Sequence, residues 1–479
     1  MKSFWAIVNL TWKNAVRSHV FQLLLLVLML CVACVPTTVR GGVAASDFIQ
    51  ISIFYTLSAI SFILALSAVW IGCFVMTQDI EGYQLHMVVT KPVSRVKIWF
   101  AKWLGVSLIH LVLLCVSALA TYFIVLWNFE KQDYPKEELA KVRSEVMVGR
   151  RVYRPVRPDF DAIAREVVKR RVTDLQKKGQ PVDLSPEGQD KMFAEVKRMV
   201  ISRNTELPFE AFRTWRYENL PKNLDKPVFL RYRTYIEKVS SKGQRMTRGL
   251  WLLGVPRFRQ NQQGAAVQNQ AKGGQGKDYD VYFFPLSQGP EQAMSGVFHE
   301  KRLDPKWGFV TPSQEVYLRY LNADDNKTAQ FFQESDGPKL LIAVTGFGAN
   351  YARAVLVIAL GIVMLAGLGC AFGGFMSLPT ALFVVISYLL FGSLSSYIIS
   401  QTYVSGLGDQ MARLVAGIVM KLVIPLQVFD MTSLVSKGEL VEFSYIAKLF
   451  YFYFPRALVL YALGIFMYRR RELGLIIRK

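Results

Sequence analysis

Cysteine and histidine are scarce in this chain, which has five cysteines and four histidines among 479 residues. All five cysteines fall within long apolar runs, so no disulfide bond can hold the polar part of the chain together. Cys31 and Cys34 form a C-x-x-C pair without a βαβ context, which favours ordinary membrane-helix cysteines over a redox site. His299 is the single histidine in the long polar stretch 129–345, and no H-E-x-x-H or G-x-S-x-G motif occurs, so we expect no catalytic residue and no metal site.

Nucleotide-binding motifs are absent as well. Gly274, Gly276 and Lys277 lack the phosphate-loop spacing, with Asp278 at the Ser/Thr position, and the pair Gly346 and Gly348 lacks the third glycine of a dinucleotide site. We therefore expect no cofactor and no ATP hydrolysis by this chain itself. A membrane enzyme is the least favoured class.

Charged residues make up only 19% of the chain, whereas 52% of its residues are hydrophobic. The apolar residues gather in six runs, each close to the ~17 to 25 residues that cross a bilayer as a helix. These runs are 20–38, 51–76, 104–127, 351–372, 380–400 and 450–468. They predict an α-helical polytopic membrane protein with six transmembrane helices.

The net charge of +21 is explained by the lipid bilayer and by topology rather than by nucleic acid, because the basic residues are spread over a chain built around membrane segments. Twelve cations fall in segments that we place in the cytosol, and such an asymmetry orients both termini inward. They are Lys2, Lys13, Arg17, Lys91, Arg95, Lys97, Lys102, Arg469, Arg470, Arg471, Arg478 and Lys479. We expect a multi-pass protein of a bacterial cytoplasmic (inner) membrane.

The N-terminal residues 1–18 are predicted to form an interfacial amphipathic elbow helix, because apolar side chains recur every four residues opposite a polar face. A cleaved signal peptide is less favoured, because the region is long and no clean cleavage site follows it. We expect Trp5, Trp12, Lys13 and Arg17 to anchor this helix at the membrane surface. Arg469, Arg470 and Arg471 are expected to do so after the last span.

Residues 129–345 are predicted to form an extracytoplasmic domain between transmembrane helices 3 and 4. Its first half carries helical apolar stripes, one starting at Phe160 and one capped by Ser185 and Pro186. Its second half has short strand-like runs at 228–236, 249–255, 279–284, 316–321 and 340–344. The domain is therefore expected to be mixed α+β and β-sandwich-like, with a mobile surface loop at 260–277.

The C-terminal part, 346–479, is predicted to hold transmembrane helices 4–6 and an outer amphipathic segment at 405–448. Its stretch 409–429 is apolar but contains Arg413 and Lys421 and includes Pro425. Because each cation at the centre of a span costs about 2.5 to 3.5 kcal/mol on insertion scales, we expect this stretch to lie on the outer surface. In the third span, His110 is expected to be neutral and bonded to a neighbouring group.

The loop at 78–102, within residues 19–128 that hold transmembrane helices 1–3, is charged and is expected to be cytosolic. Lys91-Pro92-Val93-Ser94-Arg95, followed after six residues by Lys102-Trp103-Leu104-Gly105, resembles the K-P-x-S-R and G-K-x-x-G pattern of ABC transporter permeases of the type 2 exporter family, with Ala101 at the first glycine. The turn around Ser377 to Pro379 and the ending Arg470 to Leu473 are also similar to that family. A basic flank that only fixes topology is the alternative reading of this loop.

The resemblance implies that 78–102 is the coupling loop that contacts a separate ABC ATPase subunit. The residues expected to carry this coupling are Asp79, Glu81, Tyr83, Lys91, Pro92, Ser94 and Arg95. It also implies a dimer with a second permease copy or paralogue, in an ABC exporter or mechanotransmission complex. The alternative function is a membrane-anchored extracytoplasmic binding or scaffolding protein without transport activity, and an extracytoplasmic protein or glycan partner is compatible with both.

Overall fold

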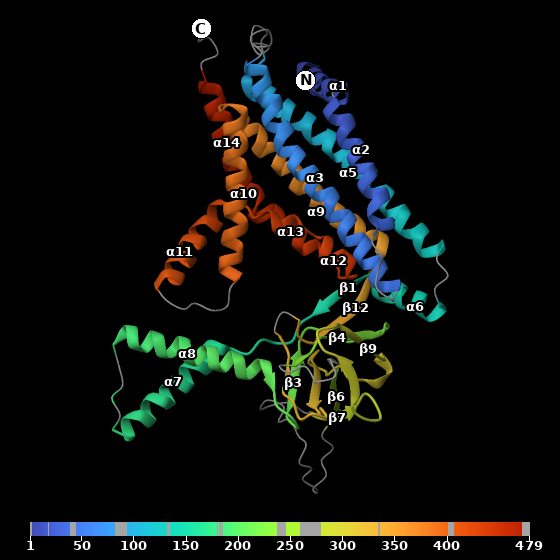
Figure 1. Ribbon diagram of the computed structural model, residues 1–479, viewed down its shortest axis with the longest axis vertical. Coiled ribbons are helices and arrows are strands. Elements are labelled where there is room, and N and C mark those ends of the chain that lie inside the picture. Colours follow the sequence, from blue (N-terminus) through green and yellow to red (C-terminus); the bar gives the residue numbers. More distant parts are fainter. Residues whose placement is uncertain are drawn as a thin grey trace. The chain divides into compact units, whose positions relative to one another are not determined.

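The computed structural model describes residues 2–17, 19–38, 45–81, 93–131, 135–179, 181, 185–236, 246–258, 279–333, 336–400 and 407–471. The chain divides into two compact units, which are coloured by sequence in Figure 1. The first, or helical unit, joins Met1–Gly149 to Val344–Lys479. The second, or inserted unit, is Arg150–Ala343.

The helical unit is built from long apolar helices. They are α1 (Lys2–Arg17), α2 (His19–Thr38), α3 (Ala45–Glu81), α5 (Arg95–Lys131), α6 (Lys136–Glu145), α9 (Phe347–Gly373), α10 (Leu378–Ser400), α11 (Leu407–Leu422), α12 (Thr432–Ser436), α13 (Phe443–Phe452) and α14 (Phe454–Arg470), with the short 3-10 turn η2 (Leu426–Phe429). Among the described residues, five helical stretches are long and apolar enough to cross a membrane. The count is six if α1 and α2, which meet at a bend of 63°, form one broken span.

Helix α9 lies at the centre of the helical unit. It packs against α3, α5, α10 and α14, and most of its side chains from Phe347 to Gly373 are buried. Helix α10 instead leaves a large apolar surface uncovered, including Phe383 (71% exposed) and Leu390 (65% exposed). In a membrane-spanning chain such a surface contacts lipid or another apolar helix.

The segment predicted to lie on the outer surface contains α11, an amphipathic helix. Met411, Leu414 and Leu422 are exposed on it, while Ala416 is buried. Arg413 and Lys421 belong to the same helix. Apolar and basic side chains on one helix are typical of a helix at a membrane surface. The placement of this segment on the outer surface stays a prediction.

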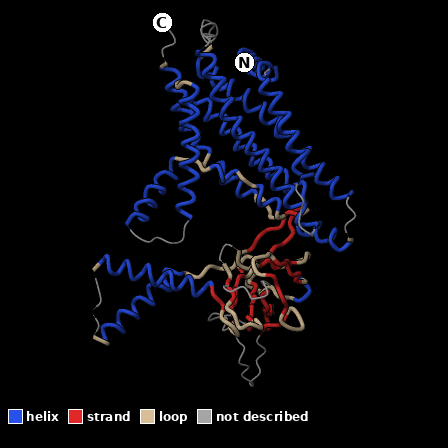
Figure 2. The backbone as a smooth tube through the Cα atoms, in the orientation of Figure 1, coloured by secondary structure: helices blue, strands red, loops and turns tan. Residues whose placement is uncertain are grey.

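In the inserted unit, the strand β1 (Val148–Tyr153) comes first, two helices follow, and the remaining strands come after them (Figure 2). The sequence predicts the two helices and the later strands but not β1. The helices α7 (Phe160–Lys177) and α8 (Pro186–Thr205) pack against each other. The Asp159 carboxylate caps α7 by accepting from the backbone N–H groups of Asp161 and Ala162, and the Ser185 hydroxyl caps α8 by accepting from that of Gly188. These are the short polar residues that satisfy free N–H groups at a helix start.

The strands of the inserted unit form three sheets. They are β1 (Val148–Tyr153), β2 (Glu206–Leu207), β3 (Phe212–Tyr217), β4 (Val228–Tyr232), β5 (Tyr235–Ile236), β6 (Met246–Phe258), β7 (Tyr279–Pro285), β8 (Glu291–Met294), β9 (His299–Leu303), β10 (Val316–Asn322), β11 (Gln330–Phe331) and β12 (Lys339–Gly346), with the turn η1 (Pro305–Trp307). One sheet has the order β1-β12-β4-β9, the second β3-β10-β6-β7 with β8 beside β6, and the third β2-β11-β5. Each strand run that the sequence predicts coincides with one or two of these strands.

An aromatic cluster fills the core between the sheets. The Trp251 ring lies 4.8 Å from that of Tyr320 and 5.0 Å from that of Tyr232, and all three side chains are buried. Along β10 every second residue from Val316 to Asn322 is buried, the period of a strand with one covered face. The strand alternation in the sequence therefore identifies this core face correctly.

The structure places the start of the inserted unit later than the sequence does. Residues 129–149 group with the helical unit instead of the insertion, which begins at Arg150. Helix α6 packs against α3, its Val142 is buried, and the Glu138 carboxylate accepts a 3.2 Å hydrogen bond from the Ala45 backbone N–H. The polar composition of α6 gives no sign of these contacts in the sequence, because Val142 is the one buried residue of this short helix.

Two loops that the sequence predicts lie at 78–102 and 260–277. The predicted loop 78–102 is helical at both ends, because α3 continues to Glu81 and α5 already begins at Arg95. The glutamine-rich loop 260–277 lies outside the described residues.

Candidate coupling site

Four of the residues expected to contact an ATPase lie at the end of α3 or at the start of α5. Asp79 is in the last turn of α3, and Ser94 and Arg95 stand at the start of α5. Glu81 ends α3, with only its backbone described. The expected residues Tyr83, Lys91 and Pro92 lie outside the described residues. We call the segment from Asp79 to Arg95 the coupling segment.

A buried ion pair joins the two helices at this end. The Lys102 side chain on α5 is 8% exposed, and its Nζ forms a salt bridge with the Asp79 carboxylate on α3. The same Nζ donates a 2.8 Å hydrogen bond to the Val75 carbonyl. Lys102 therefore bonds inside the helical unit, although the sequence pattern groups it with the cations at the membrane edge.

Arg95 connects the coupling segment to the last helix. Its Nη1 donates hydrogen bonds to the backbone carbonyls of Arg469 at 2.8 Å and Arg471 at 2.9 Å, with a longer contact of 3.4 Å to that of Tyr468. These carbonyls belong to the C-terminal end of α14, where helical oxygens lack backbone donors and the helix dipole favours a cation. Ser94 adds a local contact, because its Oγ accepts a 3.4 Å hydrogen bond from the Lys97 backbone N–H.

Two tryptophans on α5 bind the backbone of α9. The Trp99 Nε1 donates to the Cys370 carbonyl at 3.2 Å, and the Trp103 Nε1 donates to the Val363 carbonyl at 3.0 Å. The two indole rings stack with centroids 6.0 Å apart. On α14, the Tyr461 hydroxyl donates to the Met364 carbonyl at 2.7 Å, and its ring lies beside both indoles. Helices α5, α9 and α14 are thus joined by polar and aromatic contacts just behind the coupling segment.

Glycines bring α3 and α9 into backbone contact. A Cβ placed on Gly369 would lie 2.6 Å from the Val69 carbonyl oxygen, and one on Gly373 would lie 2.6 Å from the Cys73 carbonyl oxygen. The reciprocal position on α3 is Gly72, where a Cβ would lie 2.7 Å from the Ala366 carbonyl oxygen. Small residues at a crossing allow this approach between membrane helices.

His110, the titratable residue expected to be bonded within the third span, has partners on both ring nitrogens. Its Nδ1 lies 2.8 Å from the Val106 carbonyl and its Nε2 lies 3.1 Å from the Ser67 hydroxyl on α3. Because a carbonyl only accepts, the Nδ1 carries the hydrogen. The imidazole is fully buried and serves as another polar link between α3 and α5.

The expected membrane-surface anchors lie mostly on exposed positions. Trp5 is 58% exposed, Trp12 is half-buried, and Lys13 and Arg17 are exposed on α1. At the other end of the chain, Arg469 and Arg470 are exposed in the last turn of α14 and Arg471 is half-buried just beyond it. The Arg470 guanidinium lies over the Phe466 ring, 4.3 Å from its centroid.

Sequence reasoning missed the internal partners of the coupling segment. The sequence pattern groups Lys102 with the membrane-edge cations and places Lys102 and Trp103 in the family motif, but it gives Trp99 and Tyr461 no role. The one available signal is the spacing of four between Trp99 and Trp103, which puts both indoles on one face of α5.

The inserted unit contains ionic clusters of a structural kind. Arg150 is 1% exposed and makes a bidentate pair with Glu300, at 2.7 and 3.1 Å. In a second cluster, burial opposes ionisation of Asp336, but hydrogen bonds from Arg233 and Tyr235 outweigh it and lower the pKa of this carboxyl. Among the described residues, no group of three or more His, Cys, Asp or Glu side chains could hold a metal ion.

Comparison with known proteins gives one match. A family model described as ABC-2 family transporter protein matches residues 5–134, which include α1, α2, α3, the coupling segment and α5. These residues therefore carry an ABC-2 family transporter domain, in agreement with the resemblance found in the sequence. No curated protein and no solved structure matches the chain.

Proposed function

We propose that this protein is the membrane-spanning permease subunit of an ABC exporter or mechanotransmission complex, driven by a separate ATPase subunit. The observation that carries the proposal is the ABC-2 family transporter domain at residues 5–134, which contains the coupling segment. The chain is a multi-pass membrane protein, and we place both termini and the coupling segment in the cytosol of a bacterium, on the cation asymmetry.

The contacts around the coupling segment support a mechanical role. One end of the segment is tied to α5 through Asp79 and Lys102, and the other is tied to α14 through Arg95. Behind these contacts, the Trp99 indole bonds the backbone of α9. A displacement of the segment by an ATPase is therefore transmitted to α3, α5, α9 and α14 together. In this scheme Asp79 and Arg95 are positioning residues, and Glu81, Tyr83, Lys91 and Pro92 are left to contact the ATPase.

A second permease copy or paralogue completes the proposed complex. The exposed apolar residues of α10 provide a surface that a partner helix or lipid has to cover in a membrane. The ABC-2 family in general implies a dimer with two ATPase subunits, and this chain supplies one set of spans.

The inserted unit is proposed to lie outside the cell and to bind an extracytoplasmic protein or glycan. Residues 150–343 hold 34 Lys and Arg against 23 Asp and Glu, a net charge of +11 that favours an anionic partner. On the five-stranded sheet, the Arg319 guanidinium carbon lies 4.6 Å from the centroid of the Phe212 ring and 3.8 Å from that of the Phe283 ring. Phe212 is 60% exposed, and such a ring beside a cation suits an acidic sugar.

The test is co-purification of the full-length protein with its ATPase and stimulation of ATP turnover. The double variant Glu81→Lys with Tyr83→Ala changes only the proposed contact, so we expect binding and stimulation to fall together, by about tenfold or more for groups at an interface centre. Arg95→Ala removes the link to α14, so we expect stimulation to fall while binding remains. Lys97→Ala, an exposed cation two residues further along α5, is the matched control.

Wild-type binding and stimulation in the double variant would refute the coupling assignment and leave this segment as a topology signal. If no ATPase co-purifies with the wild-type protein, the alternative of a membrane-anchored binding or scaffolding protein is favoured. Arg95→Lys separates the effect of charge from that of guanidinium geometry, because lysine keeps the cation but lacks the planar fork of N–H donors.

A further inference from the structure

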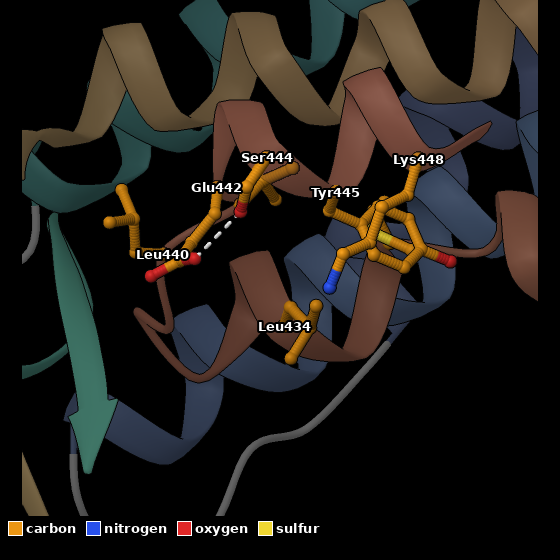
Figure 3. A pocket seen from close by; sticks show the side chains of 8 residues that line it. Leu434, Leu440, Glu442, Ser444, Tyr445 and Lys448 are labelled. Carbon is orange, nitrogen blue, oxygen red and sulfur yellow. Dashed lines mark hydrogen bonds between the residues drawn. The ribbon is translucent and has the colours of Figure 1, made fainter. Parts of the chain in front are cut away.

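A pocket of about 210 Å³ lies where α12, the following loop and α13 meet (Figure 3). Its walls are Met431, Leu434, Leu440, Val441, Glu442, Ser444, Tyr445 and Lys448. All of these residues belong to the helical unit, so the pocket is formed within one compact part of the chain.

The pocket has apolar walls and opposite charges at its two ends. Figure 3 shows the Glu442 carboxylate on one side and the Lys448 amine on the other, with Leu434 between them. The Glu442 Oε2 accepts a 2.9 Å hydrogen bond from the Ser444 hydroxyl, which holds the carboxylate at its end. The Tyr445 hydroxyl already donates to the Val428 carbonyl at 2.6 Å, so tyrosine contributes its ring as a wall.

The pocket stands at one end of a membrane span. The stretch Phe443–Arg470 is a candidate span of 28 residues. It consists of α13 and α14, and a straight helix of this many residues would be about 42 Å long, against a hydrocarbon thickness of about 30 Å. Arg469 and Arg470 mark one end, whereas Glu442 and Ser444 mark the other, next to the exposed ring of Phe443 (64%). Charged and aromatic side chains at a span end lie at the level of lipid headgroups.

We propose that this pocket binds the phosphoethanolamine headgroup of a membrane lipid. The phosphate lies at the Lys448 end and the primary ammonium at the Glu442 end, because each then meets an opposite charge. A volume of about 210 Å³ equals roughly seven water molecules at ~30 Å³ each, enough for a phosphodiester, two methylene groups and an amine. The apolar walls at Leu434 and Leu440 cover the methylene groups.

Other headgroups match this pocket less well. A phosphocholine has no N–H to donate to the Glu442 carboxylate, because three methyl groups surround its nitrogen. A phosphoglycerol carries no ammonium group, so it gains no ion pair at the Glu442 end of the pocket. The arrangement therefore selects for a primary amine and not merely for a phosphate.

The experiment is native mass spectrometry of the purified full-length protein in detergent, titrated with palmitoyl-oleoyl lipids that differ only in headgroup. We expect half-saturation of one retained lipid at about tenfold lower concentration for phosphatidylethanolamine than for phosphatidylcholine or phosphatidylglycerol, because one charge-assisted hydrogen bond separates them. Lys448→Gln should weaken retention of phosphatidylethanolamine and phosphatidylcholine alike. Glu442→Gln should abolish the preference between these two lipids while retention itself persists.

Lys421→Gln on α11 is the matched control, since it removes a cation of the same unit outside the pocket, and it should leave the preference unchanged. Free phosphoethanolamine is the second arm: failure to displace the lipid at millimolar concentration supports a lipid source for the headgroup, and displacement at micromolar concentration overturns it. Equal retention of all three lipids by the wild-type protein also overturns the proposal, whether or not the variants fold. The proposal is also overturned if Lys448→Gln abolishes dimer formation while lipid retention stays unchanged. That result would mean that a second copy of the chain, and not a lipid, occupies the pocket.

Discussion

Substitution of Gly369 by alanine tests whether the crossing of α3 and α9 depends on backbone contact. The added Cβ would lie 2.6 Å from the Val69 carbonyl oxygen, 3.1 Å from the Cys73 nitrogen and 3.2 Å from the Gly72 Cα. A comfortable carbon to oxygen contact is about 3.3 to 3.6 Å. The helices must therefore separate by several tenths of an ångström, and because all three neighbours are backbone atoms, no side chain can rotate away.

The expected cost follows from two opposing effects. Overpacking of a tight core costs about 1 to 3 kcal/mol, whereas alanine is favoured over glycine in a helix interior by about 1 kcal/mol. Gly417 on α11 supplies the control, because a Cβ there meets nothing within 4 Å. Gly417→Ala should be neutral or stabilising by up to about 1 kcal/mol, and the difference between the two variants isolates the overpacking at the crossing.

The assay is unfolding of the full-length protein in mixed micelles by increasing dodecyl sulfate, followed by tryptophan fluorescence. We expect Gly369→Ala to unfold at lower dodecyl sulfate fraction than Gly417→Ala, with a free energy of unfolding lower by about 1 to 3 kcal/mol. Equal shifts in the two variants would refute the reasoning, since they would mean that the α3 and α9 backbones are not in contact at this position.

Three further predictions concern charge. Lys102→Met should lower the free energy of unfolding by about 3 to 5 kcal/mol in the same assay, because it leaves the Asp79 carboxylate without its cation, and the double variant Lys102→Met with Asp79→Leu should recover most of the loss. The inserted unit should lose stability in circular dichroism melts as pH falls below about 4. The folded pKa of Asp336 is depressed, so its stabilising effect is fully present above the unfolded value of about 3.9 and is lost as pH falls toward the folded value. Asp336→Asn should flatten that dependence. In a cysteine-free background, a cysteine at Gln176 should react with an impermeant reagent on intact cells and one at Ser94 only after permeabilisation, and the reverse pattern would invert the topology.

The local parts of the fold are predictable from the sequence, because their causes are local. The apolar runs locate the long helices, although α3 and α5 begin six and nine residues before their runs. Ser185 and Pro186 mark the start of α8, and alternation along 316–321 marks the strand β10. Each of these signals depends on neighbours within one or two turns of the chain.

The long-range parts could not be predicted in the same way. Arg95 bonds the carbonyl of Arg471, 376 positions along the chain, and neither residue differs in sequence from an ordinary basic flank. Lys102 is likewise indistinguishable from a surface lysine until its partner Asp79 is placed beside it. The glycines of α9 indicate that another helix packs closely against it, but the periodicity of the sequence does not identify that helix as α3. Partner choice is a property of the packed helices.

The way the inserted unit joins the helices has a consequence for how the chain can vary. The chain leaves the helical unit through β1 and returns through β12, and these are neighbouring strands of one sheet. Neighbouring strands lie about 4.8 Å apart, so the two ends of a long detour stand as close together as the ends of a hairpin. The distance between the two ends of the insertion does not grow with the length of the insertion. Residues can therefore be added to it or removed from it without moving the helices apart. Each doubling of its length adds only about 0.6 kcal/mol to the free energy of closing the loop. The helical unit can therefore keep its packing when the insertion changes in length or is lost.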